Sequence, residues 1–303
     1  MTRTLIIGAN GQLGRALAST FSPNNMVVEA VRRNPRSNQV QIDLADTVAM
    51  VGLLRDLAPD LILIAGASTN VDQCEQDPFL CRKINVVGPR EVAHYAHMKG
   101  SSVVYYSTDH VFDGAQRPYT ESDAVHPLNV YSQSKAEGET MIREIVPDHH
   151  LIIRTSWLYG PDVEERNFPL RLIRRLLAGE RVPVPVDQWG SPTFTEDVAL
   201  TTRFLMDRGE IGTFHATGPD FINRFAYASR IASQFGLPED QLVPTPTAQL
   251  GQTAPRALRV QLDCRKLGLL GGPPLRDIEK GIVALKEWRV AYVGEKDVRR
   301  TPA

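Results

Sequence analysis

The sequence has few cysteines, no surplus of charge of either sign and no long hydrophobic run. Its 303 residues include 34 lysines and arginines against 35 aspartates and glutamates, which gives a formal net charge of -1. Balanced charge argues against a nucleic-acid-binding protein, because phosphate binding normally leaves a basic surplus. Apolar runs such as Leu61 to Ala67 are far shorter than the roughly 20 residues of a membrane span. The amino terminus has no secretory-signal pattern, so we expect a cytoplasmic protein.

Three cysteines are present, Cys74, Cys81 and Cys264. An odd, low count does not supply a disulfide framework and is typical of a reducing compartment. Cys74 and Cys81 have no further cysteine or histidine at a spacing that would complete a zinc site. We therefore expect structural thiols and no bound metal.

Short apolar segments alternate with segments of helical period in the first half of the chain. We expect strands at 4–7, 26–31, 61–65, 103–106 and 151–153, and helices at 12–21, 47–57, 78–98 and 134–145. Such alternation is typical of parallel strands joined by right-handed crossovers. Strands that are apolar at nearly every position fit a sheet covered on both faces. The sequence therefore predicts an α/β fold with a Rossmann-type, doubly wound parallel sheet over residues 1–155.

The pattern changes after about residue 155, where prolines crowd the loops. Shorter helices are expected at 168–177, 195–206 and 225–235. Because no clean linker separates the two parts, residues 156–303 are expected to form mainly a smaller substrate-binding lobe, interleaved with returns to the Rossmann sheet.

A glycine-rich turn, Gly8-Ala9-Asn10-Gly11-Gln12-Leu13-Gly14, follows the first expected strand and opens the first expected helix. Glycines at such spacing permit a tight turn, backbone approach to a pyrophosphate and close helix–strand packing. The phosphates then lie on the amides at the helix amino terminus. The spacing is G-x-x-G-x-x-G rather than G-x-G-x-x-G, and a plain glycine-rich turn is the alternative. We expect a dinucleotide site here.

The residues after the second expected strand bear on which dinucleotide is bound. Arg32 and Arg33 directly follow that strand, and guanidinium groups bind a 2′-phosphate in bidentate fashion. They favour NADPH, and two solvated loop arginines are the alternative. Asp43 is positioned to accept a hydrogen bond near the adenine, or else to cap the helix that begins at Thr47.

Tyr131 and Lys135 are four residues apart, so on a helix they share one face. A free phenol, with a pKa of about 10, gives up its proton sluggishly. An adjacent ammonium is expected to lower that pKa towards the working range, which suits the protonation of a reduced carbonyl. A chance surface pair is the alternative. Thr108 ends the fourth expected strand, where ligands of a parallel sheet bind; its alternative role is to form a turn.

Several stretches of the sequence resemble the extended short-chain dehydrogenase/reductases, and within them the dTDP-4-dehydrorhamnose reductase family. Besides the glycine turn, these stretches are Thr69–Glu75, Tyr106–Phe112, Pro127–Tyr131, Lys135 with Gly138-Glu139, Arg154–Gly160, Asn167-Phe168 and Asp187–Thr193. They run in order from residue 4 to about residue 220, and the likeness thins afterwards. Gln12 within the glycine turn and the stretch Ser107-Thr108-Asp109 are fairly specific to this branch.

The resemblance implies an oxidoreductase that uses NADPH, with NADH as the alternative, to reduce dTDP-4-dehydro-L-rhamnose to dTDP-L-rhamnose. It implies Tyr131 as the proton donor, Lys135 as the residue that binds the nicotinamide ribose and tunes Tyr131, and Thr108 as the third catalytic residue. The implied cofactor contacts, beside Gly8 and Gly14 of the turn, are Gly11, Gln12, Leu13, Asp43, Leu44, Ala65, Gly66, Ala67, Tyr106, Tyr131 and Lys135. Thr108, Asp109 and Trp157 would contact the sugar, and core packing is the alternative for Trp157.

The sequence also departs from the family pattern. Ser132 follows Tyr131 where glycine is usual, and His110 replaces a common tyrosine beside the substrate. Some members dimerise through magnesium held by acidic residues, one of which lies just after the glycine turn. Arg15-Ala16 stands there in this chain, so we expect no such metal. The proline-rich substrate motif is partial, and its Arg256 is a candidate for the nucleotide phosphates, with a surface role as the alternative.

The expected partner is a nucleotide-sugar substrate, and the protein is further expected to form a homodimer. We expect it to bind neither nucleic acid nor a membrane. One alternative function is that of another sugar-nucleotide reductase or epimerase of the same superfamily. A second is a non-catalytic NADP-binding regulatory subunit, against which the intact set of Thr108, Tyr131 and Lys135 argues.

Overall fold

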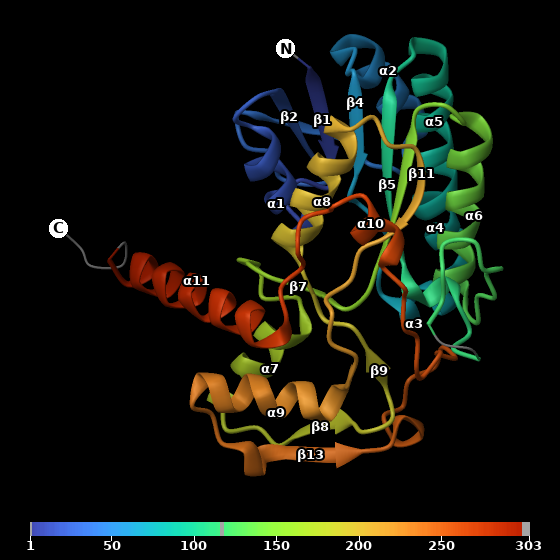
Figure 1. Cartoon of the computed structure of the whole chain (residues 1–303). Coiled ribbons are helices and arrows are strands. Elements are labelled where there is room, and N and C mark those ends of the chain that lie inside the picture. The colour runs from blue at the N-terminus through green and yellow to red at the C-terminus, as the bar shows by residue number, and fades with distance from the viewer. Residues whose placement is uncertain (1, 116–117, 299–303) are drawn as a thin grey trace.

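A parallel sheet of seven strands forms the centre of the protein (Figure 1). The structure is a computed structural model that describes residues 2–115 and 118–298. In spatial order the strands are β11 (Gly212–His215), β6 (His150–Thr155), β5 (Ser102–Thr108), β4 (Leu61–Ile64), β1 (Arg3–Ile7), β2 (Met26–Val31) and β3 (Gln39–Gln41). The predicted Rossmann-type sheet is confirmed, and every strand predicted in the first half of the chain belongs to it.

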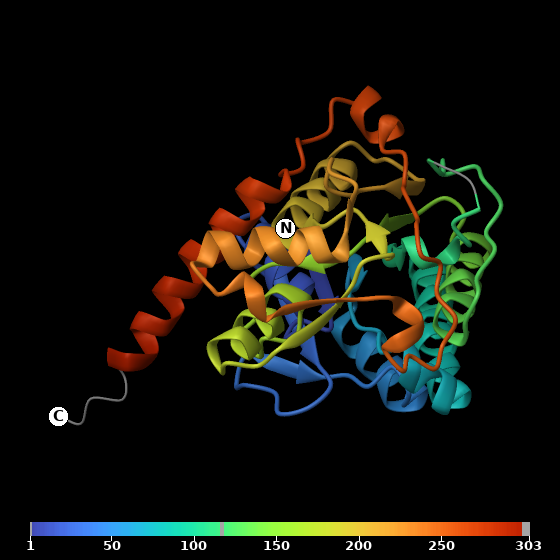
Figure 2. The same ribbon diagram turned by 90° about the horizontal axis from the view of Figure 1, so that it is seen from below.

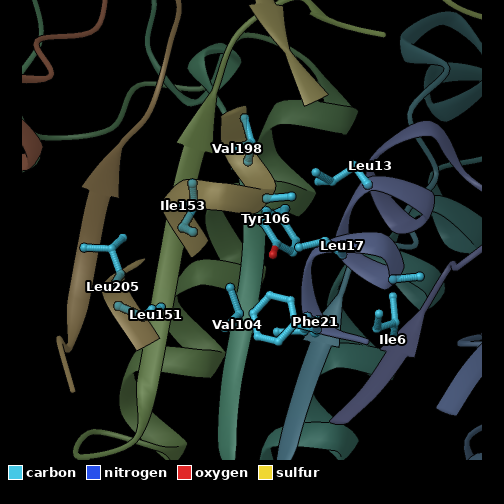
Figure 3. Close-up of a cluster of buried hydrophobic side chains, with 14 of the residues drawn as sticks. Ile6, Leu13, Leu17, Phe21, Val104, Tyr106, Leu151, Ile153, Val198 and Leu205 are labelled. Atoms are coloured by element: carbon cyan, nitrogen blue, oxygen red, sulfur yellow. The ribbon is translucent and has the colours of Figure 1, made fainter. Parts of the chain in front are cut away.

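Helices cover both faces of the sheet, as strands that are apolar at nearly every position require. One face carries α2 (Thr47–Leu57), α5 (Gly88–Lys99) and α6 (Val130–Ile145), and the other carries α1 (Gln12–Phe21) and α8 (Thr195–Asp207). Successive residues of a strand alternate between the faces. Leu5 therefore packs in the apolar core under α2, α5 and α6 (the first core), and Ile6 packs in the core under α1 and α8 (the second core). Figure 3 shows the second core, where Leu17 and Phe21 of α1 meet Val104 of the sheet.

A smaller lobe lies below the sheet in Figure 1. It contains α7 (Phe168–Leu177), β8 (Val182–Pro185), α9 (Arg224–Phe235), β13 (Leu242–Thr245) and α11 (Ile278–Val298), with the strand pairs β7 (Leu158–Tyr159) to β10 (Thr193–Phe194) and β9 (Trp189–Gly190) to β12 (Ile222–Asn223). Its own apolar core includes Leu170, Val184 and Tyr227. The carboxyl-terminal part of α11 extends away from the body of the molecule (Figure 2).

The chain passes repeatedly between the two parts. After β6 ends at Thr155 it enters the lobe, and it returns to the sheet with α8, β11 and α10 (Arg265–Leu269), whose Leu267 packs in the second core of the sheet. The division into residues 1–155 and 156–303 stays a prediction, and these returns are of the kind that it anticipates.

The single helix predicted at 78–98 is wrong, because the segment is interrupted. It consists of α4 (Pro78–Arg82), one π-helical turn over Lys83–Val87 and α5. Pro89 has no N–H group to donate to the carbonyl of Asn85, and the hydroxyl of Tyr105 donates to that carbonyl instead, at 3.0 Å. The short helix α3 (Val71–Gln76), which precedes α4, and α11 were not predicted at all.

Among the helices of the described residues, none combines the length and the apolar character that crossing a membrane requires.

Candidate active site

A cleft of about 480 Å³ lies at the carboxyl ends of the central strands, where parallel sheets bind ligands. Its volume is within the usual range for small-molecule sites. Most residues predicted to contact the cofactor line it, namely Gly8, Gly11, Gln12, Leu13, Arg32, Asp43, Leu44, Ala65, Gly66, Ala67, Tyr106, Tyr131 and Lys135. Gly14 and Arg33, which belong to the same prediction, do not line the cleft.

Two glycines of the turn let three backbone segments meet. Gly8 has a φ of +90°, and a Cβ atom on it would lie 2.6 Å from the backbone nitrogen of Gly66. A Cβ atom on Gly14 would lie 2.2 Å from the carbonyl oxygen of Gly8. Gly11 precedes α1 as its N-cap, and among the described residues no side chain caps the first amides of this helix. These amides therefore suit a pyrophosphate, and the backbone fits a dinucleotide cofactor.

Arg32 and Asp43, which were predicted to contact the adenosine part of the cofactor, both line the cleft. Arg33 is exposed beside them without lining the cleft. The alternative role of Asp43 as the cap of α2 is excluded, since the carboxylate of Asp46 accepts the hydrogen bond from the amide of Ala49. Asp43 accepts a hydrogen bond from the amide of Ala45 at 2.9 Å, which fixes its carboxylate at the cleft.

Gln12 joins the sheet to the smaller lobe. Its side-chain amide donates to the carbonyl of Leu158 at 3.2 Å, and its amide oxygen accepts from Nδ2 of Asn167 at 3.0 Å. Asn167 also caps α7, because its Oδ1 accepts from the amide of Leu170. The side chain of Gln12 is therefore engaged between the lobes, while its backbone lies at the cleft.

Tyr131 and Lys135 lie in the first two turns of α6, and both are buried at the wall of the cleft. The start of this helix is fixed by a capping box in which Asn129 and Ser132 exchange side-chain to backbone hydrogen bonds. Ser132, the residue that departs from the family pattern, thus has a structural role. Because α6 begins at Val130, earlier than the predicted residue 134, Tyr131 is on the helix and shares a face with Lys135.

Burial dominates the ionisation of both residues. It raises the pKa of Tyr131 well above its ordinary value, although a hydrogen bond with Thr108 lowers that pKa in part. It lowers the pKa of Lys135 to about 7, against the opposing charge of Glu139. The expectation that Lys135 depresses the pKa of Tyr131 is therefore not met in this structure, because removal of water from the phenol is the larger effect.

Thr108, at the end of β5, connects Tyr131 to a buried carboxylate. Its hydroxyl donates to Oδ1 of Asp109 at 3.1 Å and accepts from the amide of His110 at 3.2 Å. The second oxygen of Asp109 accepts from the hydroxyl of Ser156 at 2.5 Å. The ring of His110 lies edge-on to that of Tyr131, with 6.2 Å between centroids. Thr108 and Asp109 do not line the cleft itself but adjoin it at Tyr131.

The indole of Trp157 packs between other protein groups. The Arg224 guanidinium carbon lies 3.3 Å from the ring centroid, and a Cβ atom on Gly190 would lie 2.5 Å from the indole Cε2. Packing, the alternative given for Trp157, therefore accounts for its position in this structure, and a stack on a sugar ring stays a prediction. Its backbone has a φ of +42°, a strained value of the kind that gathers at functional sites.

Arg256 is engaged elsewhere. Its guanidinium binds both carboxylate oxygens of Asp72 in α3, at 2.8 and 3.2 Å. The amides of Thr253 and Ala254 also donate to Asp72, and the bond to Arg256 holds the pKa of this carboxyl well below its usual range. Arg256 thus fastens a loop to α3, and we do not include it among the residues proposed to bind phosphate.

Sequence analysis missed a polar cluster packed against Tyr131. The side chains of Cys74 and Cys81 both pack with Tyr131, and the Cys74 thiol lies 3.5 Å from the hydroxyl of Ser68. Cys81 also contacts Ser134 at 3.4 Å, and Nδ2 of Asn85 donates to the same hydroxyl at 2.9 Å. The cysteines are free thiols. No spacing signal marks them, because α3 and α4 bring them together only through the fold.

The cleft has further walls that sequence analysis did not assign to it. They are Ile7, Asn10, Val31, Ile42, Thr69, Ile84, Ser107, Thr155, Leu158, Asp162, Arg166 and Asn167. Ile7, Val31 and Thr155 are end residues of strands, so the topology, rather than any local motif, places them at the cleft.

The sequence and the fold are similar to those of known proteins. A family model described as the RmlD substrate binding domain matches residues 2–288. The chain belongs to this family. It is 30% identical over 292 residues to a dTDP-4-keto-6-deoxy-D-glucose reductase of Streptomyces niveus, covering 95% of this chain and 94% of that protein. It is also 32% identical over 281 residues to methionine adenosyltransferase 2 subunit beta of Rattus norvegicus, covering 89% and 82%.

Among solved structures, the RmlD family chain is similar to dTDP-4-dehydrorhamnose reductase of Bacillus anthracis in complex with NADP. The TM-score is 0.85 at 30% identity, and the match covers 94% of this chain and 98% of that one. The predicted family and fold class are therefore confirmed, and the reductase names and the NADP complex agree with the predicted oxidoreductase class.

Proposed function

We propose that this protein is an NADPH-dependent reductase of the 4-keto group of a nucleotide-linked 6-deoxy sugar, with dTDP-4-dehydro-L-rhamnose as substrate and dTDP-L-rhamnose as product. The observation that carries the proposal is the position of Tyr131 and Lys135, one helical turn apart and buried at the wall of the cleft that begins at the glycine turn. The NADP complex of the Bacillus anthracis relative supports the choice of cofactor.

When bound in the cleft, NADPH would supply a hydride to the keto carbon. The chain's own residues bind the cofactor phosphates and supply the proton. The uncapped amides of α1 bind the pyrophosphate, and Arg32 binds the 2′-phosphate. Tyr131 donates its phenolic proton to the keto oxygen, and its position beside the cleft orients that transfer. Thr108 turns its single O–H, which donates to Asp109 in this structure, towards the same oxygen, and Ser156 continues to hold Asp109.

Lys135 holds a proton that is lost near neutral pH, since burial lowers its pKa to about 7. As an ammonium, it stabilises the phenolate that remains on Tyr131 after proton transfer. The high pKa of Tyr131 keeps the phenol protonated before the reaction. Burial alone thus keeps the phenol protonated but makes it a weaker acid, and it leaves Lys135 only partly charged at neutral pH.

A second candidate function is that of a regulatory subunit that binds NADP without turnover. The relative named as a methionine adenosyltransferase subunit favours it. Tyr131 and Lys135 at the wall of the cleft, with Thr108 hydrogen-bonded to Tyr131, support the catalytic function over this one. Another reductase or epimerase acting on a related sugar nucleotide is the third candidate, and the Streptomyces niveus relative supports that class.

The test is NADPH consumption with dTDP-4-dehydrorhamnose generated in situ. The native protein is expected to oxidise NADPH. Tyr131→Phe should lose about a thousandfold in kcat, the scale of general acid catalysis, with unchanged NADPH affinity. Tyr95→Phe is the matched control, because the Tyr95 hydroxyl is buried and has no hydrogen-bond partner among the described residues. Equal rates for native protein and Tyr131→Phe would refute the proposal.

A homodimer, the absence of nucleic-acid and membrane partners and the cytoplasmic location all stay predictions. Sedimentation of the purified protein tests the first of these directly.

A further inference from the structure

Arg224, the first residue of α9, places its guanidinium against aromatic rings. The guanidinium carbon lies 3.3 Å from the ring centroid of Trp157 and 4.7 Å from that of Phe168. Both rings in turn stack on Tyr227, with centroids 6.4 and 5.9 Å away. A separation of 3.3 Å is a face contact, so the ring covers a face of the guanidinium. The N–H groups, which lie in the guanidinium plane, are left for another partner.

No such partner is found within residues 2–115 and 118–298, where the guanidinium of Arg224 makes neither a salt bridge nor a hydrogen bond. Burial lowers the pKa of Arg224 to about 9, which expresses the cost of holding this cation away from water. Arg154 shows how the same chain satisfies a buried arginine, because two hydrogen bonds of 2.9 and 2.6 Å join it to Glu139. The Arg224 side chain is half-buried, and a partly buried guanidinium without a carboxylate partner suits a site that binds an anion.

Arg224 lies near the candidate active site, because the aromatic residues that it contacts adjoin both the Thr108–Asp109 pair and the cofactor cleft. Trp157 follows Ser156, which binds Asp109 beside Thr108. Phe168 follows Asn167, which lines the cleft. Arg224 is also close enough to Asp109 to feel its charge, and Arg171, one turn beyond Phe168 on α7, adds a second positive charge to its surroundings. Arg171 likewise has no side-chain partner among the described residues.

We propose that Arg224 binds the diphosphate of the nucleotide-sugar substrate. The inference rests on the proposed function. A guanidinium binds phosphate oxygens in bidentate fashion, and the aromatic rings fix its orientation in advance. The cofactor pyrophosphate is the other anion available, but it has the uncapped amides of α1, and Arg224 does not line the cofactor cleft. Arg256, the arginine first expected to bind these phosphates, is bound to Asp72.

The experiment measures binding of dTDP to protein saturated with NADP+, by titration calorimetry, so that dTDP cannot enter the cofactor site. Arg224→Met should weaken dTDP binding at least about tenfold, the scale of a lost charge-assisted hydrogen bond, and Arg224→Lys should weaken it less. NADP+ affinity should be unchanged in both. Arg230→Met is the matched control, because Arg230 lies on the same helix but pairs with Glu279 at the surface.

Thermal unfolding gives a readout that separates binding from packing. If Arg224 serves the substrate, Arg224→Met removes an uncompensated charge and leaves the melting temperature equal or higher. Full dTDP affinity in Arg224→Met overturns the proposal and leaves the proposed function intact. A loss of dTDP affinity that comes with a lower melting temperature and weaker NADP+ binding also overturns it, in favour of a structural role. Native protein that binds NADP+ but no dTDP overturns both proposals.

Discussion

The ammonium nitrogen of Lys135 lies 3.7 Å from the centroid of the Tyr105 ring. Tyr105 is fully enclosed in the core between the sheet and the helices α5 and α6. Lys135 therefore stands over an aromatic face instead of in water, and no hydrogen bond or salt bridge to its ammonium is found in residues 2–115 and 118–298. A cation–π contact compensates part of the lost hydration, and the remaining cost lowers the pKa of Lys135 to about 7.

This burial predicts how the stability of Lys135→Met depends on pH. The pKa of lysine is about 10.4 in an unfolded chain and about 7 here, so the unfolded state binds more protons between these values. The free energy of unfolding of the native protein must then rise with pH over that window. The cost of the buried lysine is greatest below pH 7, and Lys135→Met should be stabilised relative to the native protein there, by roughly 4 kcal/mol more than at pH 10.

Urea unfolding at pH 6 and at pH 10 measures the effect, with Lys99→Met as control because Lys99 is exposed. The same difference in stability between Lys135→Met and native protein at both pH values would show that Lys135 keeps an ordinary pKa in the folded state.

Arg32 and Arg33 are adjacent in the sequence but differ in position, since only Arg32 lines the cleft. We therefore expect Arg32→Ala to weaken NADPH binding by about tenfold or more, the value of a charge-assisted phosphate contact, while NADH binding changes little. Arg33→Ala is the matched control and should leave both affinities unchanged. Fluorescence titration with the two cofactors measures the ratio of their affinities. Equal losses in the two variants would indicate that the 2′-phosphate is recognised elsewhere.

Local sequence patterns predicted the parts of this fold that depend on local physics. The strands of the first half have the continuous apolar character of a sheet covered on both faces, and α1 begins and ends at the predicted residues 12 and 21. The glycine turn, Tyr131 and Lys135 were found for the same reason, because their spacing sets their geometry. The break at Pro89 was also visible in the sequence, but the segment around it is otherwise of helical period.

The remainder of the site depends on contacts between distant segments. Nothing near Arg256 in the sequence indicates that Asp72 binds it, because 184 residues separate the two. The packing of Cys74 and Cys81 on Tyr131, the burial of Lys135 against Tyr105 and the aromatic surroundings of Arg224 likewise arise from contacts between distant segments. For this reason the expected direction of the pKa shift of Tyr131 was wrong. The four-residue spacing indicated that the charge of Lys135 lies nearby, but it could not indicate that folding removes water from the phenol.

The ion pair of Glu139 and Arg154 is buried, with side chains 2% and 3% exposed. Glu139→Gln would leave the Arg154 guanidinium without its counter-charge, next to the ring of Phe112 and to His215. We expect a loss of about 3–5 kcal/mol in the free energy of unfolding. Glu137→Gln, two residues away on the same helix, removes the exposed pair with Arg82 and should cost less than about 1 kcal/mol. Comparable losses from chemical denaturation of the two variants would contradict the burial of Glu139.

The hydrogen bond between Asn167 and Gln12 joins the amino terminus of α1 to that of α7, across the cleft. Asn167 makes two further bonds, to the carbonyl of Gly160 and, as a cap, to the amide of Leu170. Gln12 makes one further bond, to the carbonyl of Leu158. The two side chains thus contribute unequally to stability but share one contact.

A double-mutant cycle isolates that contact. Asn167→Ala should lower the free energy of unfolding by about 2 kcal/mol, since it removes a cap and two donated hydrogen bonds. Gln12→Ala should cost about 1 kcal/mol. The double variant should lose less than the sum of the two, with a coupling of about 0.5–1 kcal/mol, because either single change already breaks the shared bond. Urea unfolding of all four proteins gives the cycle, and strict additivity would mean that Gln12 and Asn167 do not hold the two lobes together.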